Sequence, residues 1–523
     1  MNLLSKHAFA GWRNRPALIN SLSFLLGLCL VFAYAPFSVW PLTFIILCLW
    51  FYIIADSPLK QATQAGFSFG LGWFGAGISW VYVSIDKFGG LPVVVSLLLM
   101  LLLFSYLALY PALTCYLSAK LSRNNRLQLW LLPSMWLFTE YLRSVVLTGF
   151  PWLSIGYSQI DSPLSAFAPI IGETGVTLII LCFVVCINQL IKGNAVKWHL
   201  FSIASLLLTT IIVHQLHWLT PTHKILKTAL IQGNIAQDMK WAPEHEWPTM
   251  KAYLDLTRVN YDADLIIWPE SAIPRLEPLA QEFIDLADRA ALVNNTSIIT
   301  GVQSYHFNTK EYFNSLVVLG KQAANDTESH YSMYNQDRYY KHHLLPIGEF
   351  VPFQQWLRPI APLFNLPMSS FSRGNYIQPN LVANGVHILP LICFEIAFPE
   401  QLRANFSNST QLLLTVSNDG WFGDSHGPHQ HLEIAQMRAL EFGRPLLRDT
   451  NNGVTAVVDA QGQIINQLPQ FKQAVLRTNV ALVTGRTPFS RYGHWPSTIL
   501  ASLLLVAYFI RHRRVQTKAD VEI

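Results

Sequence analysis

Three side chains in the polar part of the chain could together perform nucleophilic chemistry: Glu270 in DLIIWPES, Lys341 in RYYKHHLLPIGEF and Cys393 in HILPLICFE. Each stands at or near the end of an apolar, strand-like run, where catalytic groups tend to project from α/β sheets. A cysteine thiol needs a base to ionise it at neutral pH, and a carboxylate in an apolar pocket can act as that base. An ammonium group favours the thiolate and can stabilise an oxyanion. Strand-end glutamates and lysines are also common solvated residues, so the residue types alone leave a structural reading open.

The distribution of cysteines distinguishes Cys393 from the rest. Five of the six cysteines lie in long apolar runs, namely Cys29, Cys48, Cys115, Cys182 and Cys186. Cys393 alone belongs to the polar region, so it has no intradomain partner for a disulfide. It is either a buried core residue or a nucleophile.

The apolar residues are distributed as in a membrane protein. The 523 residues are 51% hydrophobic and 13% charged, whereas soluble proteins average roughly 25% charged. This excess fills residues 1–216, is absent from 217–490 and returns once within 491–523. We expect a membrane domain, a globular domain and a C-terminal anchor, with about eight spans: 17–35, 38–55, 65–85, 91–117, 127–148, 164–190, 199–216 and 495–510. Residues 1–35 also resemble a signal peptide, but we expect the first span to stay uncleaved because Pro36 and a second apolar run follow at once.

Basic residues predict the orientation of these spans. If the eight spans cross the membrane in alternating directions, five basic clusters fall on one side. They are Lys6, Arg13 and Arg15; Lys60; Lys120, Arg123 and Arg126; Lys192 and Lys197; and Arg511, Arg513, Arg514 and Lys518. The positive-inside rule makes that side cytoplasmic, so 217–490 is expected on the opposite face. The net charge of +5 reflects this topology, and we expect no nucleic-acid partner.

The region 217–490 has the pattern of an α/β domain. Strand-like runs rich in β-branched residues occur at TALIQGNI, ADLIIWPES, SIITGVQS, NSLVVLG, HILPLICFE, LLLTVSND and VTAVVDAQGQII. Helix-like segments at 245–261, 276–295, 398–407 and 428–443 separate several of them. Strands that alternate with helices predict sheets covered by helices.

Four ordered motifs resemble the nitrilase superfamily: WPE at 268–270, YYKHHLLPIGEFVP at 339–352, ICFE at 392–395 and SNDGWFG at 417–423. The resemblance implies an αββα sandwich with Glu270 as general base, Lys341 as oxyanion stabiliser and Cys393 as nucleophile. It implies supporting roles for Glu349, Glu395 and the backbone N–H of Phe394, although some relatives have a tyrosine in place of Phe394.

The resemblance also suggests substrate contacts by three tryptophans. Trp241 in DMKWAP matches a loop residue at the substrate entrance, with ordinary aromatic packing as the alternative. Trp421 lies in the SNDGWFG stretch that completes the pocket. Trp356 belongs to 353–371, which is too apolar for an ordinary exposed loop; a flexible arm on the lipid surface and a loop packed on the membrane domain remain equal alternatives.

A nitrilase-like domain between seven spans and one C-terminal span resembles the membrane-anchored lipoprotein acyltransferases of this superfamily. That resemblance implies transfer of an acyl chain from a phospholipid, phosphatidylethanolamine above all, through a cysteine thioester to the N-terminal amine of a diacylated apolipoprotein. It implies a multi-pass protein of the bacterial inner membrane with its catalytic domain in the periplasm, and neither a metal nor another cofactor. The alternative is a membrane-tethered amidohydrolase in which water replaces the amine.

Two further groups of polar residues stand out. Glu140 and Arg143, three residues apart in an apolar segment, predict either a functional pair or an interfacial ion pair. His426, His429 and His431 cluster in DSHGPHQH, but their spacing matches none of the regular zinc patterns.

Overall fold

The computed structural model describes residues 15–519, apart from 334, 336, 347 and 351–370. It divides the chain into a helical unit of residues 1–82, 92–216 and 492–523 and an α/β unit of residues 83–91 and 217–491. The short segment 83–91 therefore groups with the α/β unit, although it lies between two apolar segments of the sequence. The arm predicted at 353–371, with Trp356, falls outside the described residues except for Phe371.

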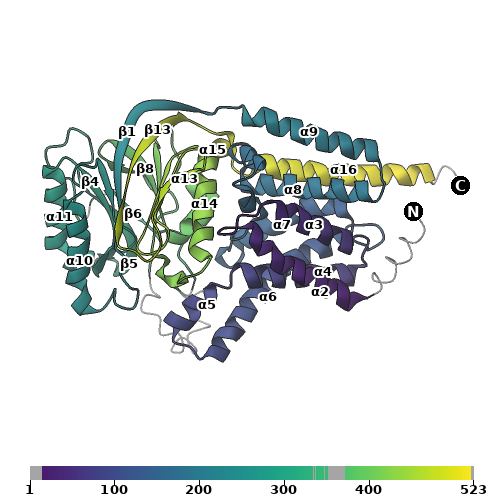
Figure 1. Ribbon diagram of the computed structural model, residues 1–523, viewed down its shortest axis with the longest axis horizontal. Helices are drawn as coiled ribbons and strands as arrows, with labels where there is room; N and C mark the ends of the chain where they lie inside the picture. The colour runs from purple at the N-terminus through teal and green to yellow at the C-terminus, as the bar shows by residue number, and fades with distance from the viewer. Residues whose placement is uncertain (1–14, 334, 336, 347, 351–370, 520–523) are drawn as a thin grey trace. The chain divides into compact units, whose positions relative to one another are not determined.

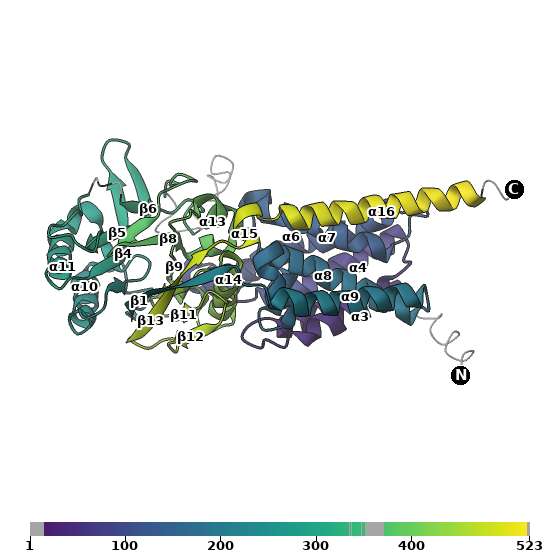
Figure 2. The same ribbon diagram turned by 90° about the horizontal axis from the view of Figure 1, so that it is seen from above.

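Each of the eight apolar segments contains a helix, because long runs of Leu, Ile, Val and Phe satisfy their backbone groups internally when helical. The helices are α2 (Pro16–Cys29), α3 (Pro41–Ile54), α4 (Leu59–Gly77), α6 (Val93–Lys120), α7 (Leu132–Val145), α8 (Ala168–Ile191), α9 (Val196–His214) and α16 (Trp495–Ala519). The last helix packs beside α7 and α8 (Figure 2). The C-terminal apolar segment thus joins the same unit as the first seven.

Four helical segments within the described residues are long and apolar enough to cross a membrane: Pro16–Ala33, Val93–Lys120, Pro163–Ile191 and Val196–His214. Two shorter apolar helices, Pro41–Ile54 and Trp495–Arg511, accompany them. A helical membrane unit is therefore present, and its number of crossings stays a prediction.

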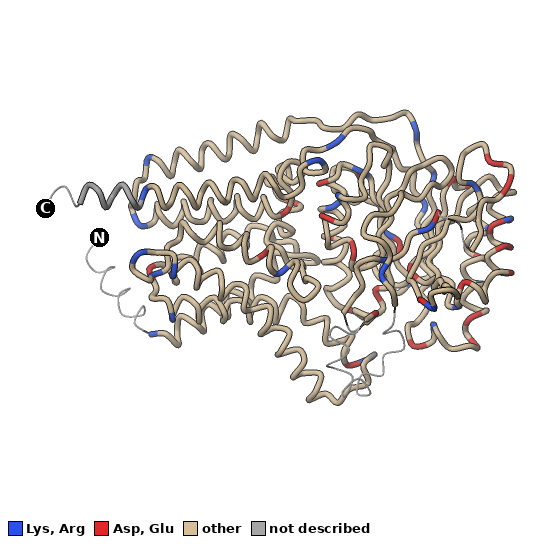
Figure 3. The backbone as a smooth tube through the Cα atoms, turned by 180° about the vertical axis from the view of Figure 1, so that it is seen from behind, with Lys and Arg blue, Asp and Glu red and all other residues tan. Residues whose placement is uncertain are grey.

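Basic connections meet at one end of the helical unit. The ammonium group of Lys192 pairs with Asp56 at 2.8 Å, and Nε of Arg126 donates to the backbone carbonyl of Asp56. These contacts join the connections that follow α3, α6 and α8. Lys and Arg positions, coloured blue along the backbone, gather at this end of the helices in Figure 3.

The α/β unit contains two mixed sheets. The first has the order β13-β1-β2-β4-β5-β6, with β3 paired to β4, and the second has the order β12-β11-β10-β9-β8-β7. Strands β1, β2 and β4 are parallel, as are β8, β9 and β10. The strands are β1 (Leu219–Gln232), β2 (Leu265–Ile267), β3 (Ile273–Leu276), β4 (Ser297–His306), β5 (Glu311–Gly320), β6 (Arg338–Tyr340), β7 (Leu381–Ala383), β8 (Val386–Ile392), β9 (Leu412–Ser417), β10 (Leu446–Thr450), β11 (Ala456–Val458), β12 (Ile464–Gln467) and β13 (Ala474–Gly485).

Helices cover the outer faces of both sheets. Helices α10 (Pro243–Arg258) and α11 (Gln281–Val293) pack on the first sheet, while α13 (Pro399–Asn405) and α14 (Gly427–Phe442) pack on the second. Figure 1 shows α10 and α11 on one side of the paired sheets and α14 on the other. Two helix-covered sheets packed face to face form the predicted αββα sandwich, with strand runs such as Leu265–Ile267 and Leu412–Ser417 wholly buried.

A close backbone approach fixes the loop that carries Glu270. A Cβ atom added to Gly301, in β4, would lie 2.4 Å from the amide nitrogen of Ser271 and 2.6 Å from the carbonyl oxygen of Pro269. Because backbone atoms cannot move aside as flexible side chains do, this position in β4 requires glycine.

We expect Gly301→Ala to destabilise the protein by about 1–3 kcal/mol, because the added methyl group must push two backbone segments apart. Thermal unfolding of the purified full-length protein measures this loss. Gly75→Ala is the control, since the nearest heavy atom to its new Cβ would be a ring carbon of Phe104 at 3.8 Å. An unfolding temperature of Gly301→Ala equal to that of the wild type would contradict the steric argument.

Candidate active site

The three candidate residues follow the ends of three strands, as the sequence predicts. Glu270 lies three residues after β2, Lys341 directly follows β6, and Cys393 directly follows β8. All three are nearly enclosed, with exposed fractions of 8%, 1% and 8% respectively. The two sheets therefore contribute one wall each, with Glu270 and Lys341 from the first and Cys393 from the second.

The Lys341 ammonium lies between two carboxylates. Its Nζ is 3.4 Å from Oε1 of Glu270 and 2.8 Å from Oε2 of Glu349. Oε2 of Glu349 also accepts from the backbone N–H of Leu345. Burial acts to lower the pKa of Lys341, but Glu349 and Glu270 more than offset it and hold the pKa above its usual value. The two carboxylates therefore favour the charged form of Lys341.

Two asparagines hold the Glu270 carboxylate: Asn314, which no sequence motif marks, and Asn418, which lies in the SNDGWFG stretch. Nδ2 of Asn314, in β5, donates to Oε1 of Glu270 at 2.7 Å and to Glu349 at 3.0 Å. The backbone N–H of Asn418 donates to Oε2 of Glu270 at 3.0 Å. Both oxygens are thus oriented. An asparagine near the start of a strand-like run carries no signal that separates it from other polar residues.

Electrostatics keeps the Cys393 thiol protonated at rest. Burial and the negative charge of Glu270 raise the pKa of Cys393 well above its usual value, while the Lys341 cation acts in the opposite direction without reversing the shift. A thiol in this state becomes a nucleophile only when its proton is transferred during attack. The Glu270 carboxylate is the group whose negative charge acts on the thiol most strongly.

Glu395 ties the strand ends together. Its Oε1 accepts the backbone N–H groups of His342 and His343, directly after Lys341, at 2.8 and 3.0 Å. Its Oε2 accepts the N–H of Ile392, directly before Cys393, at 2.8 Å. The carboxylate, which is fully buried, therefore sets the spacing between the lysine segment and the cysteine segment. The neighbouring Phe394 ring packs edge-on against Phe398.

Trp241 and Trp421 are half-buried residues of the α/β unit. Trp241 follows Lys240, whose ammonium lies 5.9 Å from the indole ring and donates to the backbone carbonyl of Glu270 at 3.0 Å. Burial lowers the pKa of Lys240 to about 8. The carbonyl of Trp421 accepts from the hydroxyl of Ser84, in the segment 83–91. The third tryptophan, Trp356, is outside the described residues.

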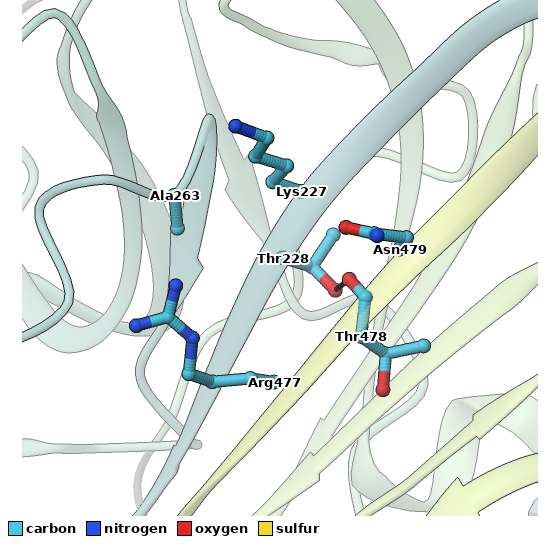
Figure 4. A pocket seen from close by; sticks show the side chains of 6 residues that line it. All are labelled: Lys227, Thr228, Ala263, Arg477, Thr478 and Asn479. Carbon is cyan, nitrogen blue, oxygen red and sulfur yellow. Dashed lines mark hydrogen bonds between the residues drawn. The ribbon is translucent and has the colours of Figure 1, made fainter.

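Within the described residues no group of three His, Cys, Asp or Glu side chains is arranged to hold a metal ion. A surface cavity of about 280 Å³ opens between β1 and β13 (Figure 4), and it is lined by Lys227, Thr228, Ala263, Arg477, Thr478 and Asn479. Its arginine is already bound by Asn260 and Asp262. None of the candidate residues lines this cavity, so it is separate from the site.

The fold and the site define a nitrilase-type α/β domain joined to a helical membrane unit. Residues 227–487 match the carbon-nitrogen hydrolase family, and residues 26–186 match the apolipoprotein N-acyltransferase N-terminal domain. The chain is 48% identical to the apolipoprotein N-acyltransferase of Shewanella oneidensis over 98% of this chain and 100% of that protein. It is 40% identical to that of Haemophilus influenzae over 95% of each chain.

The chain therefore belongs to the apolipoprotein N-acyltransferase family. The predictions of a nitrilase-like domain, a membrane domain and an acyltransferase of lipoproteins are confirmed at this level. A solved carbon-nitrogen hydrolase of Helicobacter pylori is also similar, with 14% identity and a TM-score of 0.37 over 57% of this chain and 98% of that one; at this score the likeness adds nothing to the assignment.

We expect Glu270→Gln to lower the pKa of Cys393, because the carboxylate charge that helps to raise it is removed. The pH dependence of alkylation by iodoacetamide, followed on the Cys393 peptide by mass spectrometry, measures this pKa. Glu282→Gln, on the exposed side of α11, is the control for removing one negative charge. A profile of Glu270→Gln that matches the wild type, or lies at higher pH, would show that the Glu270 charge does not raise the pKa of the thiol.

Proposed function

We propose that this enzyme transfers an acyl chain from a membrane phospholipid, phosphatidylethanolamine in the first place, to the α-amine of an S-diacylglyceryl cysteine at the N-terminus of an apolipoprotein. Family membership supports the reaction class. The observation that carries the catalytic assignment is the buried Lys341 ammonium beside Glu270, on the wall opposite Cys393. The donor lipid follows from the requirement for an ester already present in the membrane.

In the first step, Sγ of Cys393 attacks the sn-1 ester carbonyl while Glu270 takes the thiol proton. The oxyanion that forms faces the Lys341 ammonium and the backbone N–H of Phe394. The carbon–oxygen bond to glycerol then breaks, and Glu270 returns its proton to the leaving oxygen. A lysophospholipid departs and the acyl chain remains as a thioester on Cys393.

In the second step, the lipoprotein amine attacks the thioester carbonyl. An α-amine has a pKa of about 7.7–8.0, so a modest base suffices to remove its proton, and Glu270 takes that proton. The carbon–sulfur bond then breaks, and the thiolate recovers the proton. The product is an amide, and the thiol is regenerated. Glu349 and Glu395 hold Lys341 and the strand ends, while Trp241 and Trp421 contact the substrates.

We propose that all eight apolar helices cross the bacterial inner membrane, with residues 1–216 as a seven-helix domain, 217–490 as the periplasmic catalytic domain and 491–523 as the last crossing and cytoplasmic tail. The meeting of basic connections at one end of the helical unit supports a cytoplasmic location for that end. Helix α9 starts from there, so the chain reaches residue 217 at the other end. Both substrates are amphiphiles, and exposing acyl chains to water costs about 0.8 kcal/mol for each CH₂, which favours catalysis at the membrane surface.

We expect Cys393→Ala to abolish a fatty-acyl adduct that forms when the purified enzyme is incubated with phosphatidylethanolamine. Intact-protein mass spectrometry detects the adduct, and hydroxylamine should release it because it is a thioester. Cys186→Ala, which changes a buried cysteine of α8, should leave the adduct intact. Added diacylated lipopeptide should gain the acyl chain. An adduct that persists in Cys393→Ala would refute the nucleophile, and one released only as free fatty acid would favour an amidohydrolase.

A further inference from the structure

A buried ionic cluster behind Cys393 has no role in the steps above. Asp419 lies just beyond β9, His431 lies on α14 and Arg448 lies in β10, and none of them exposes more than 1% of its surface. Nη2 of Arg448 donates to Oδ2 of Asp419 at 2.6 Å, and the hydroxyl of Ser417 donates to Oδ1 at 2.6 Å. Three polar residues from three elements are thus brought together next to the nucleophile.

The cluster contacts the main chain of the nucleophile through His431. Nε2 of the imidazole is 3.1 Å from the backbone carbonyl oxygen of Cys393, and Nδ1 is 3.3 Å from Oδ1 of Asp419. A carbonyl oxygen and an ionised carboxylate oxygen can only accept, so the two contacts together require hydrogens on both Nε2 and Nδ1, which is the protonated ring. Burial and Arg448 lower the pKa of His431, and the Asp419 carboxylate opposes that shift. Burial opposes ionisation of Asp419, but Arg448, His431 and Ser417 more than offset it and hold the pKa of Asp419 below its usual value. The ring is thereby anchored to a carboxylate that is itself fixed.

The carbonyl of Cys393 belongs to a strained part of the backbone. Cys393 has φ of +54°, a left-handed conformation that costs a non-glycine residue on the order of 1–3 kcal/mol and persists only where surrounding contacts enforce it. It also begins a 3-10 turn, Cys393–Ala397, whose first N–H groups point out of the N-terminal end. The bond from His431 is a contact that holds this conformation.

The same peptide unit joins the Cys393 carbonyl to the Phe394 N–H. Because a trans peptide is planar, its C=O and N–H groups point in opposite directions. Fixing the carbonyl toward α14 therefore aims the N–H of Phe394 away from α14. We propose that His431, held by Asp419 and Arg448, is a positioning residue that orients the Phe394 N–H toward the oxyanion of the reaction. This inference rests on the proposed roles of Cys393 and Phe394.

Two substitutions test the contacts of the two imidazole nitrogens separately. The amide nitrogen of His431→Gln reaches the place of Nε2 and keeps a donor for the Cys393 carbonyl, whereas that of His431→Asn reaches only the place of Nδ1 and keeps the contact with Asp419. We expect His431→Asn to slow formation of the acyl-enzyme about 10- to 100-fold with an unchanged KM for phospholipid. His431→Gln should stay within about threefold of the wild type.

Alkylation distinguishes this role from general damage to the site. The reaction of a thiol with iodoacetamide forms no oxyanion, so Cys393 of His431→Asn should be alkylated at the wild-type rate while its acylation is slow. Gln436→Ala is the control, because it removes one side-chain hydrogen bond from the same helix, to Gly462, and should change neither rate. If His431→Asn does not fold, His431→Met offers similar volume without a donor and should show the same separation of rates.

Equal acylation rates in the Asn and Gln variants, or a loss of alkylation in parallel with acylation, would overturn the inference. Cys393→Ala, measured beside them, distinguishes a failure of the proposed nucleophile from a failure of the positioning role. An acyl adduct that survives in Cys393→Ala refutes the proposed nucleophile itself. An adduct lost in Cys393→Ala but formed at the normal rate in His431→Asn refutes only the positioning role.

Discussion

The ion pairs of Lys341 with Glu270 and Glu349 are the constraint to which the rest of the α/β unit conforms. An ammonium with 1% exposure loses nearly all of its hydration, and such a charge is tolerated only with close, well-oriented partners. Two carboxylates supply them at 3.4 and 2.8 Å. The triplet carries one net negative charge, and that excess, acting from Glu270, helps to keep the neighbouring thiol protonated. The arrangement thus favours the charged form of Lys341 and the protonated form of Cys393 at the same time.

The backbone at or next to each of Glu270, Lys341 and Cys393 is also held by a buried polar side chain. Lys240 donates to the carbonyl of Glu270, Glu395 accepts the two N–H groups that follow Lys341, and His431 bonds to the carbonyl of Cys393. Side chains on strand ends retain torsional freedom unless their backbone is held, and catalysis of acyl transfer depends on placement to a fraction of an ångström. The supporting residues come from a loop, a turn and a helix that are distant in sequence, so the sandwich fold itself brings them together.

This distance in sequence explains which features could be predicted. The seven strand-like runs all contain strands, and the helix at 427–442 lies within one residue of its predicted bounds. The triad positions could be found because they end apolar runs and stand in recognisable motifs. Strands β3, β6, β7, β10 and β13 lie outside these runs. The first three have only three or four residues each. Strand β13 alternates exposed and buried residues and pairs with β1 from some 250 residues away, while β10 contains Arg448 and Asp449, whose burial depends on partners elsewhere. Asn314 and Lys240 were missed as site residues for the same reason, and His431 stood out only within a histidine cluster without regular zinc spacing. The contacts of all three residues are encoded by no local pattern.

Protonation of Cys393 at rest is consistent with the proposed location of the α/β unit outside the cytoplasm. Oxidation and disulfide exchange proceed through the thiolate, and unpaired thiols are prone to both in an oxidising compartment. Burial and the charge of Glu270 suppress the thiolate, so in the proposed mechanism the thiol is protected by the same carboxylate that later accepts its proton. In that mechanism, attack requires a carbonyl carbon in place to receive the sulfur electrons as the proton moves to Glu270. A proton that is transferred only with attack makes a low thiol pKa unnecessary, and the proposed reactivity is then confined to an acyl group already bound against Lys341.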